Sequence, residues 1–227
     1  MILEFSLDTP NGSRPVRTEI RDLVIAGWAG RDRDAIEHHI EELAAIGVPR
    51  PSAVPLYYRV AANQLTQDGS VQVVGPASSG EAEVFVFMAD GELCVSLASD
   101  HTDRKLEAHS VALSKQLCVK PVARTAWRMA DVAGHWDELQ LRSRIVEHGA
   151  EVAYQDGTLA SLRTPQQLIA GYTGGGPLDA HTGMLCGTVA VLGGIRPAAV
   201  FEMSLTDPRS GRSIRHRYTQ TLLPEVA

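Results

Sequence analysis

The chain has 227 residues, of which 44% are hydrophobic and only 5% aromatic, and its formal net charge is −6. A protein with this acidic balance is not expected to bind nucleic acid or an anionic membrane surface. No apolar run reaches the length of a membrane span, and the first residues lack the basic and apolar regions of a signal peptide, so we expect a cytoplasmic protein. The scattered cysteines, Cys94, Cys118 and Cys186, are predicted to be reduced thiols.

A helix is predicted from Asp32 to Ile46, with Asp32 as its N-cap and Gly47 just beyond its end. His39 and Glu42 are three positions apart on this helix, so their side chains are expected to be neighbours. A histidine beside a glutamate is also common as an ordinary surface pair. The spacing alone therefore leaves a surface pair and a catalytic dyad open.

The next predicted strand runs from Leu56 to Val60 and carries Arg59 among apolar neighbours. Beyond it, two runs rich in β-branched and aromatic residues flank Asp90-Gly91, a strong signal for a tight hairpin. If these two residues form the turn, Ala89 pairs with Glu92, and counting outward pairs Glu81 with Asp100. Residues directly opposite each other share a face, and so do residues two apart on one strand. One face is then an apolar core, comprising Ala82, Val84, Val86, Met88, Leu93, Val95 and Leu97.

The other face of this hairpin brings Glu81, Glu83 and Asp100 together at its open end, above apolar residues. Like charges in such proximity repel, so the cluster is unfavourable unless it is exposed, protonated or neutralised by a cation. A hard divalent ion suits oxygen ligands, and Mg²⁺ often takes a few carboxylates and keeps waters for substrate. The pattern leaves two interpretations open, a metal site and a solvated acidic end of a hairpin.

Helical spacing is predicted from Lys105 to Leu117, a segment that carries Lys115, before the chain returns to sheet near Pro121. A short helix capped by Thr164 is predicted later in the chain. Alternating or buried strands are predicted at Leu139–Val146, Glu151–Tyr154, Met184–Leu192, Val200–Thr206 and Ile214–Leu222. No repeat or linker divides the chain. We therefore expect one domain over residues 1–227, α+β but mostly β with a few short helices, with short strands of residues 1–25 packed onto it.

Three motifs in order carry a resemblance to a known family: Glu81-Ala-Glu83, Ser99-Asp-His-Thr-Asp-Arg104 and Cys186-Gly-Thr188. Together they resemble the fumarylacetoacetate hydrolase superfamily and, more closely, an uncharacterised bacterial branch of it. The matching motifs extend over roughly residues 23–227. The resemblance implies a mixed β-sandwich or β-roll, a homodimer, and Mg²⁺ or Mn²⁺ bound by Glu81, Glu83 and Asp100.

The resemblance also implies roles for single residues. His39 and Glu42 match the acid/base dyad of the family, and Lys115 matches its active-site lysine. Substrate contacts are implied for Arg59, Arg104 and Thr188. Read without the family, Lys115 is equally a solvated helical lysine, Arg59 a strand-edge charge and Thr188 an ordinary strand residue. The chain departs from the family at Ser99 and at Val189, and both positions adjoin expected substrate contacts.

The function implied by the resemblance is that of a metal-dependent hydrolase or lyase. Its small-molecule substrate would be a 2-oxo acid or diketo acid, converted through a metal-stabilised enolate by carbon–carbon bond hydrolysis, decarboxylation or isomerisation. One alternative is a sugar-acid dehydratase, that is, a 2-keto-3-deoxy acid lyase. A second alternative, from another class, is a non-catalytic protein that binds a metal or ligand.

Overall fold

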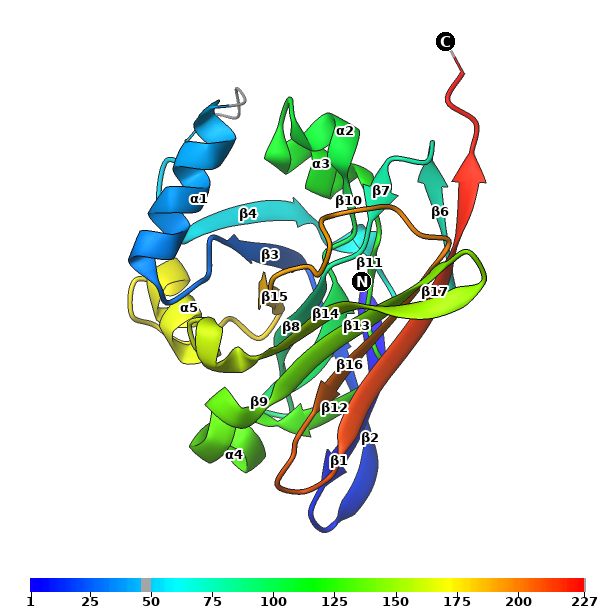
Figure 1. Cartoon of the computed structure of the whole chain (residues 1–227). Coiled ribbons are helices and arrows are strands. Elements are labelled where there is room, and N and C mark those ends of the chain that lie inside the picture. Colours follow the sequence, from blue (N-terminus) through cyan, green and yellow to red (C-terminus); the bar gives the residue numbers. More distant parts are fainter. Residues whose placement is uncertain (46–49, 227) are drawn as a thin grey trace.

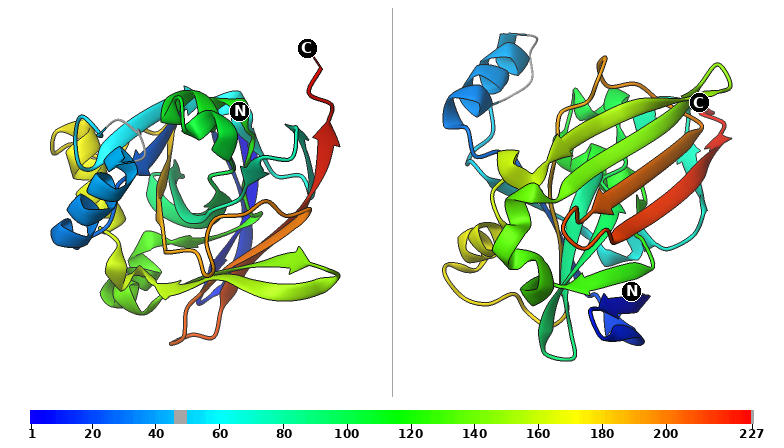
Figure 2. Two further views of the ribbon diagram at one scale, coloured as in Figure 1. Left: turned by 45° about the horizontal axis from the view of Figure 1, so that its top comes forward. Right: turned by 60° about the horizontal axis from the view of Figure 1, so that its bottom comes forward.

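The computed structural model describes residues 1–45 and 50–226, apart from the side chains of His39, Glu42, Leu43 and Ala45. Its strands form an eight-stranded sheet and a five-stranded sheet, with the helices at the periphery (Figure 1). The five-stranded sheet forms one layer, seen in the right panel of Figure 2. The predicted class, α+β and mostly β, is confirmed. Among the described residues, no helix is long and apolar enough to cross a membrane.

The eight-stranded sheet has the order β2-β1-β12-β9-β8-β15-β3-β4. In that order its strands are Gly12–Glu19, Ile2–Thr9, Thr125–Arg128, Glu92–Ser99, Ala82–Ala89, Thr182–Thr188, Asp22–Gly27 and Leu56–Ala61. The five-stranded sheet has the order β14-β13-β16-β17-β6, formed by Ala150–Thr158, Gln140–Glu147, Val200–Thr206, Ser213–Leu223 and Ser70–Val74. Two small pairs complete the strands, β10 (Thr102–Asp103) with β7 (Ser78–Ser79) and β11 (Lys120–Pro121) with β5 (Leu65–Thr66).

The helices are short apart from the first, α1. They are α1 (Arg33–Ala45), α2 (Arg104–Glu107), α3 (Val111–Leu117), α4 (Met129–Val132) and α5 (Pro165–Thr173), with 3-10 turns at Ala62–Gln64, Ala133–Glu138 and Leu159–Ser161. The predicted cap of α1 is confirmed, because the Asp32 carboxylate accepts hydrogen bonds from the backbone N–H groups of Asp34 and Ala35, both at 3.0 Å. The predicted end of this helix at Ile46 lies outside the described residues.

The single helical segment expected from Lys105 to Leu117 is wrong, because the chain forms two helices there. The Asp103 carboxylate caps α2 by accepting from the Leu106 N–H at 2.8 Å, and the Ser110 hydroxyl caps α3 by accepting from the Leu113 N–H at 3.3 Å. Asp and Ser are both preferred N-cap residues, and here each begins a helix. Figure 1 shows α2 and α3 at the end of the molecule where β7 and β10 lie.

The predicted register of the β8–β9 hairpin is confirmed. Ala89 pairs with Glu92. The turn residues Asp90 and Gly91 both have positive φ, 50° and 79°, as a two-residue I′ turn requires. At the open end, the Asp100 N–H donates to the Glu81 carbonyl at 2.9 Å.

Both faces of this hairpin are buried. Val84 and Val95 belong to a cluster that includes Leu205 of the five-stranded sheet. The opposite face packs on the N-terminal strands, where the rings of Phe5 and Phe87 stack with centroids 4.3 Å apart. The hairpin therefore lies in the interior of the molecule. The five-stranded sheet packs on one of its faces and the N-terminal strands pack on the other.

Gln155 is a buried polar side chain that joins the two sheets. A bulge in the β13–β14 pairing shifts the register between Ser143 and Arg144, and Gln155 is only 1% exposed. Its amide oxygen accepts from the Ala82 N–H at 2.9 Å and the Ser143 hydroxyl at 2.7 Å. Its amide nitrogen donates to the Thr188 hydroxyl at 2.6 Å and the Val189 carbonyl at 2.9 Å. One side chain thus ties the start of β8 to the end of β15.

We expect Gln155→Ala to destabilise the protein, because it leaves several buried polar groups without a partner. Each such group costs about 1–3 kcal/mol, and about 1 kcal/mol lowers the melting temperature of a chain this size by roughly 2–4 °C. Thermal unfolding followed by circular dichroism measures the effect. Gln72→Ala, at an exposed position on β6, is the matched control. Equal melting temperatures for both variants would contradict the role of Gln155.

Candidate metal centre

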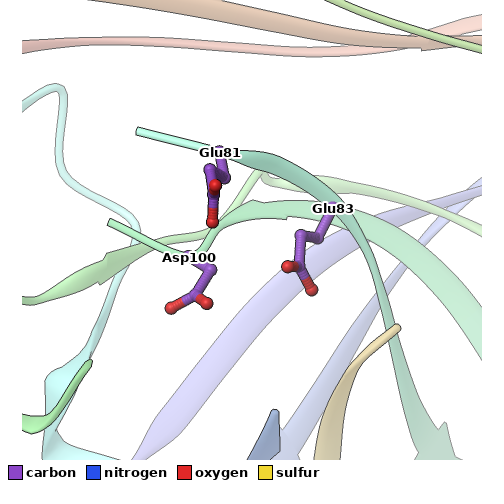
Figure 3. Close-up of side chains that lie close together, drawn as sticks. All are labelled: Glu81, Glu83 and Asp100. Atoms are coloured by element: carbon purple, nitrogen blue, oxygen red, sulfur yellow. The ribbon is translucent and has the colours of Figure 1, made fainter. Parts of the chain in front are cut away.

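The three carboxylates predicted at the open end of the hairpin come together. One oxygen from each of Glu81, Glu83 and Asp100 lies within 4.8 Å of the others. Figure 3 shows the three side chains close together. Asp100 is 0% exposed and Glu83 3%, and the Glu81 side chain is 13% exposed. The alternative of a solvated acidic end is therefore wrong. These carboxylates are enclosed and need compensation by positive charge.

Asp100 is compensated by two lysines. The Lys115 ammonium group donates to Asp100 Oδ2, and the Lys120 ammonium group lies 3.0 Å from Oδ1. Burial opposes ionisation of Asp100, but these two ammonium groups outweigh burial and hold its pKa below the usual value. The structure thus places the predicted Lys115 at the carboxylate cluster, on the inward face of α3.

Lys120 is a site residue that the sequence reasoning missed. It is 0% exposed, and its ammonium group also donates to the His101 carbonyl. Burial, followed by the neighbouring charge of Lys115, lowers the pKa of Lys120, although Asp100 opposes this. The chain has only three lysines, Lys105, Lys115 and Lys120. A rare lysine inside the apolar run from Cys118 to Ala123 is the signal that could have identified it.

The other two carboxylates differ in their surroundings. Glu83 accepts a hydrogen bond from the Gly187 N–H at 2.8 Å. Burial, together with the nearby Asp100, raises the pKa of Glu83 well above its usual value. Glu81 lies 3.2 Å from the Arg104 guanidinium, yet burial still raises its pKa. A cation added to this site would therefore stabilise the ionised forms of both glutamates.

Arg104 and Thr188, predicted to contact substrate, lie beside the carboxylates. Arg104 bridges Glu81 and Glu107, at 3.2 and 2.9 Å. Burial disfavours its charge, but these two carboxylates outweigh that and raise its pKa. Thr188 pairs with Glu83 across the β15–β8 ladder, and its hydroxyl donates to the Ala82 carbonyl at 2.8 Å. Both side chains therefore contact the residues that position the carboxylates.

The structure does not bring Arg59 to the carboxylates. Its guanidinium pairs with Asp22 and donates to the Tyr172 hydroxyl at 3.0 Å. Tyr58, the preceding residue on β4, does face the site, because the Lys115 ammonium group lies 5.7 Å from the centroid of its ring. Successive residues of a strand point to opposite faces, so Arg59 points away. Tyr58 is a second neighbour of the site that the sequence reasoning missed.

His39 and Glu42 belong to α1 by position, but their side chains lie outside the described residues. The dyad therefore stays a prediction.

The donor set suits a hard divalent cation. It consists of oxygen atoms from three carboxylates within 4.8 Å of one another, and two of the three residues are buried. Mg²⁺ and Mn²⁺ prefer such oxygen ligands, whereas softer metals prefer thiolate or imidazole ligands, which these three residues do not supply. We conclude that Glu81, Glu83 and Asp100 could hold one such ion.

A family model matches residues 26–218, which is most of the chain, and its description is "Protein of unknown function (DUF2848)". The chain belongs to this family. No curated protein matches it in sequence.

Several solved structures share the fold at low sequence identity. A 2-keto-3-deoxy-D-arabinonate dehydratase, in complex with magnesium and 2,5-dioxopentanoate, has a TM-score of 0.64 and 13% identity over 96% of this chain and 79% of its own. A fumarylacetoacetate hydrolase from Exiguobacterium antarcticum has a TM-score of 0.57 and 12% identity, covering 94% and 80%. A 4-oxalocrotonate decarboxylase from Pseudomonas putida G7, in complex with calcium and acetate, has a TM-score of 0.56 and 15% identity, covering 90% and 78%. These similarities confirm the predicted fold, and the family model agrees with the predicted resemblance to an uncharacterised family.

We expect Glu83→Gln to lose Mn²⁺ binding without losing stability. The amide oxygen can still accept from the Gly187 N–H, and a neutral group avoids burying a charge, so the free energy of unfolding should stay within about 1 kcal/mol. Isothermal titration calorimetry measures the binding, and Glu4→Gln, on the exposed side of β1, is the control. Unchanged Mn²⁺ affinity in Glu83→Gln would refute the metal centre.

Proposed function

We propose that this chain is an enzyme that depends on Mg²⁺ or Mn²⁺ and acts on a 2-oxo acid or diketo acid through an enolate. The observation that carries the proposal is the enclosed carboxylate cluster with basic side chains around it. The similar dehydratase structure, which contains magnesium and 2,5-dioxopentanoate, supports the substrate class. Carbon–carbon bond hydrolysis, decarboxylation and isomerisation are the candidate reactions, because all three proceed through such an enolate.

The charges of the site favour an anionic substrate. The three carboxylates and Glu107 face three cationic side chains, Lys115, Lys120 and Arg104, in a mostly buried region. A bound divalent ion would polarise the substrate carbonyl as a Lewis acid. It would also leave the enclosed site with excess positive charge. A 2-oxo carboxylate that has lost a carbon-bound proton is a dianion, and it would offset that excess.

The roles of the chain's own residues follow from this arrangement. His39 would take the proton from the substrate carbon, and Glu42 would hold its imidazole in the basic tautomer. Lys115 and Lys120 would favour the negative charge that develops on the substrate. Arg104 and Thr188 would fix the positions of Glu81 and Glu83. Arg59 could reach a substrate only by leaving Asp22.

A screen of 2-oxo acids, diketo acids and 2-keto-3-deoxy sugar acids tests this proposal, with Mn²⁺ present and with Mn²⁺ removed by a chelator. We expect turnover of at least one 2-oxo or diketo acid only when the metal is present. Exclusive turnover of 2-keto-3-deoxy sugar acids would favour the dehydratase alternative. Binding of the metal and of an acid without any turnover would favour the non-catalytic alternative.

On the substrate found in this way, we expect His39→Ala to lower turnover by ~10²–10⁴-fold, the usual cost of losing a general base. The Mn²⁺ affinity should be unchanged, because the imidazole is not among the predicted ligands. Glu42→Gln should lower turnover less, because it removes only the orienting charge. Steady-state kinetics and calorimetry measure the two effects.

His38→Ala is the matched control, because its side chain is exposed and lies about 100° around α1 from His39. Loss of activity in His38→Ala with full activity in His39→Ala would mean that the neighbouring histidine is the base. Full activity in both would remove the dyad from the mechanism.

We also expect the chain to form a homodimer. Val74, Leu117 and Leu223 line one groove, and each side chain is more than a third exposed. Covering such a patch would lower the risk of aggregation. Light scattering at high micromolar concentration should give the dimer mass, and Leu223→Glu should give the monomer. Ile195→Glu, at another exposed apolar position, is the control, and a monomeric wild type would contradict the expectation.

A further inference from the structure

We propose that Lys115 is a built-in counter-ion that competes with the divalent cation for Oδ2 of Asp100, so that metal binding releases its ammonium group. The inference rests on the proposed metal centre. It adds that one side chain of the site has two positions, one on the carboxylate and one away from it. The metal then controls where a positive charge of the site lies.

The competition follows from the contacts of Asp100. Each of its carboxylate oxygens faces an ammonium group, Lys115 at Oδ2 and Lys120 at Oδ1. A divalent cation held by Glu81, Glu83 and Asp100 needs at least one of these oxygens. A carboxylate oxygen has two lone pairs and can accept from an ammonium group while it binds a metal, but in an enclosed site a divalent ion repels both ammonium groups strongly. The metal and the two lysines therefore compete for Asp100, and we expect the lysine with fewer other contacts to move.

Lys115 has fewer polar contacts than Lys120 and is less completely buried. The Lys120 ammonium group lies between Asp100 Oδ1 and the His101 carbonyl, to which it donates, and its side chain is 0% exposed. Among the described residues, Lys115 donates to Asp100 alone, and it is at the edge of the cluster with 8% of its side chain exposed. Its departure leaves no backbone carbonyl unpaired, whereas the departure of Lys120 would.

The structure also shows a contact that the released ammonium group can keep. Its present position is 5.7 Å from the centroid of the Tyr58 ring, and Tyr58 is only half-buried. A lysine side chain has a flexible four-carbon stem, and an ammonium group is attracted to an aromatic face. We therefore expect Lys115 to turn toward solvent when it leaves Asp100, while it stays near the face of the Tyr58 ring.

The first test compares Mn²⁺ affinities by calorimetry in wild type, Lys115→Met and Lys120→Met. Removing the competitor should tighten binding at least about tenfold, which corresponds to about 1.4 kcal/mol. Lys120→Met removes the same charge at a similar distance from Asp100, so it reports the effect of the electric field alone. We expect the gain in Lys115→Met to exceed that in Lys120→Met.

The second test detects the release in the wild-type protein, so it does not depend on any variant folding. The chain has only three lysines, so acylation of each can be followed by mass spectrometry with and without Mn²⁺. Lys105, whose side chain is 69% exposed, should be modified under both conditions, and Lys120 under neither. Lys115 should be modified faster only when Mn²⁺ is present.

Both results are required. Equal tightening in Lys115→Met and Lys120→Met, or a modification rate of Lys115 that Mn²⁺ does not change, would overturn the inference and leave the metal centre standing. Failure of the wild type and of Lys115→Met to bind Mn²⁺ would overturn the metal centre and the inference together.

Discussion

The enclosed charge of Asp100 is the constraint on which the rest of the site depends. Its carboxylate is fully buried, and its two ammonium partners come from different elements, α3 and β11. A buried charge without a partner costs several kcal/mol, so neither element can leave its place cheaply. The segment of residues 104–121 therefore folds back over the open end of the hairpin and covers the carboxylates.

The parts of the site that the sequence predicts are those determined by local rules. The Asp90-Gly91 turn fixes the register of β8 and β9, and the alternation of a strand then determines which side chains share a face. The convergence of Glu81, Glu83 and Asp100 follows from those two rules alone. Their burial does not follow from them, because it depends on packing against α3 and against the five-stranded sheet, most of whose strands come from later in the chain.

The residues that sequence reasoning missed are positioned by non-local contacts. Lys120 reaches Asp100 from a two-residue strand that pairs with β5, more than fifty residues earlier in the chain. Gln155 is buried because a bulge in β14 shifts its register, and no local pattern marks that bulge. The break between α2 and α3 is different, because Ser110 and Asp103 are both good cap residues. There the sequence held the signal, and helical periodicity obscured it.

The backbone also links the carboxylate cluster to the helix that carries the proposed base. Gly187, which donates to Glu83, has a φ of +87°, and a Cβ atom there would lie 2.6 Å from that of Ala29. Any other residue would be strained and would push Ala29 away. The Ala29 carbonyl accepts from the Arg163 N–H at 2.9 Å, and α1 begins four residues later at Arg33. The close approach at Gly187 thus fixes the segment leading into α1 against a predicted metal ligand. Backbone packing would then set the position of a base on that helix relative to the metal centre. No direct contact between the base and the metal ligands would be needed.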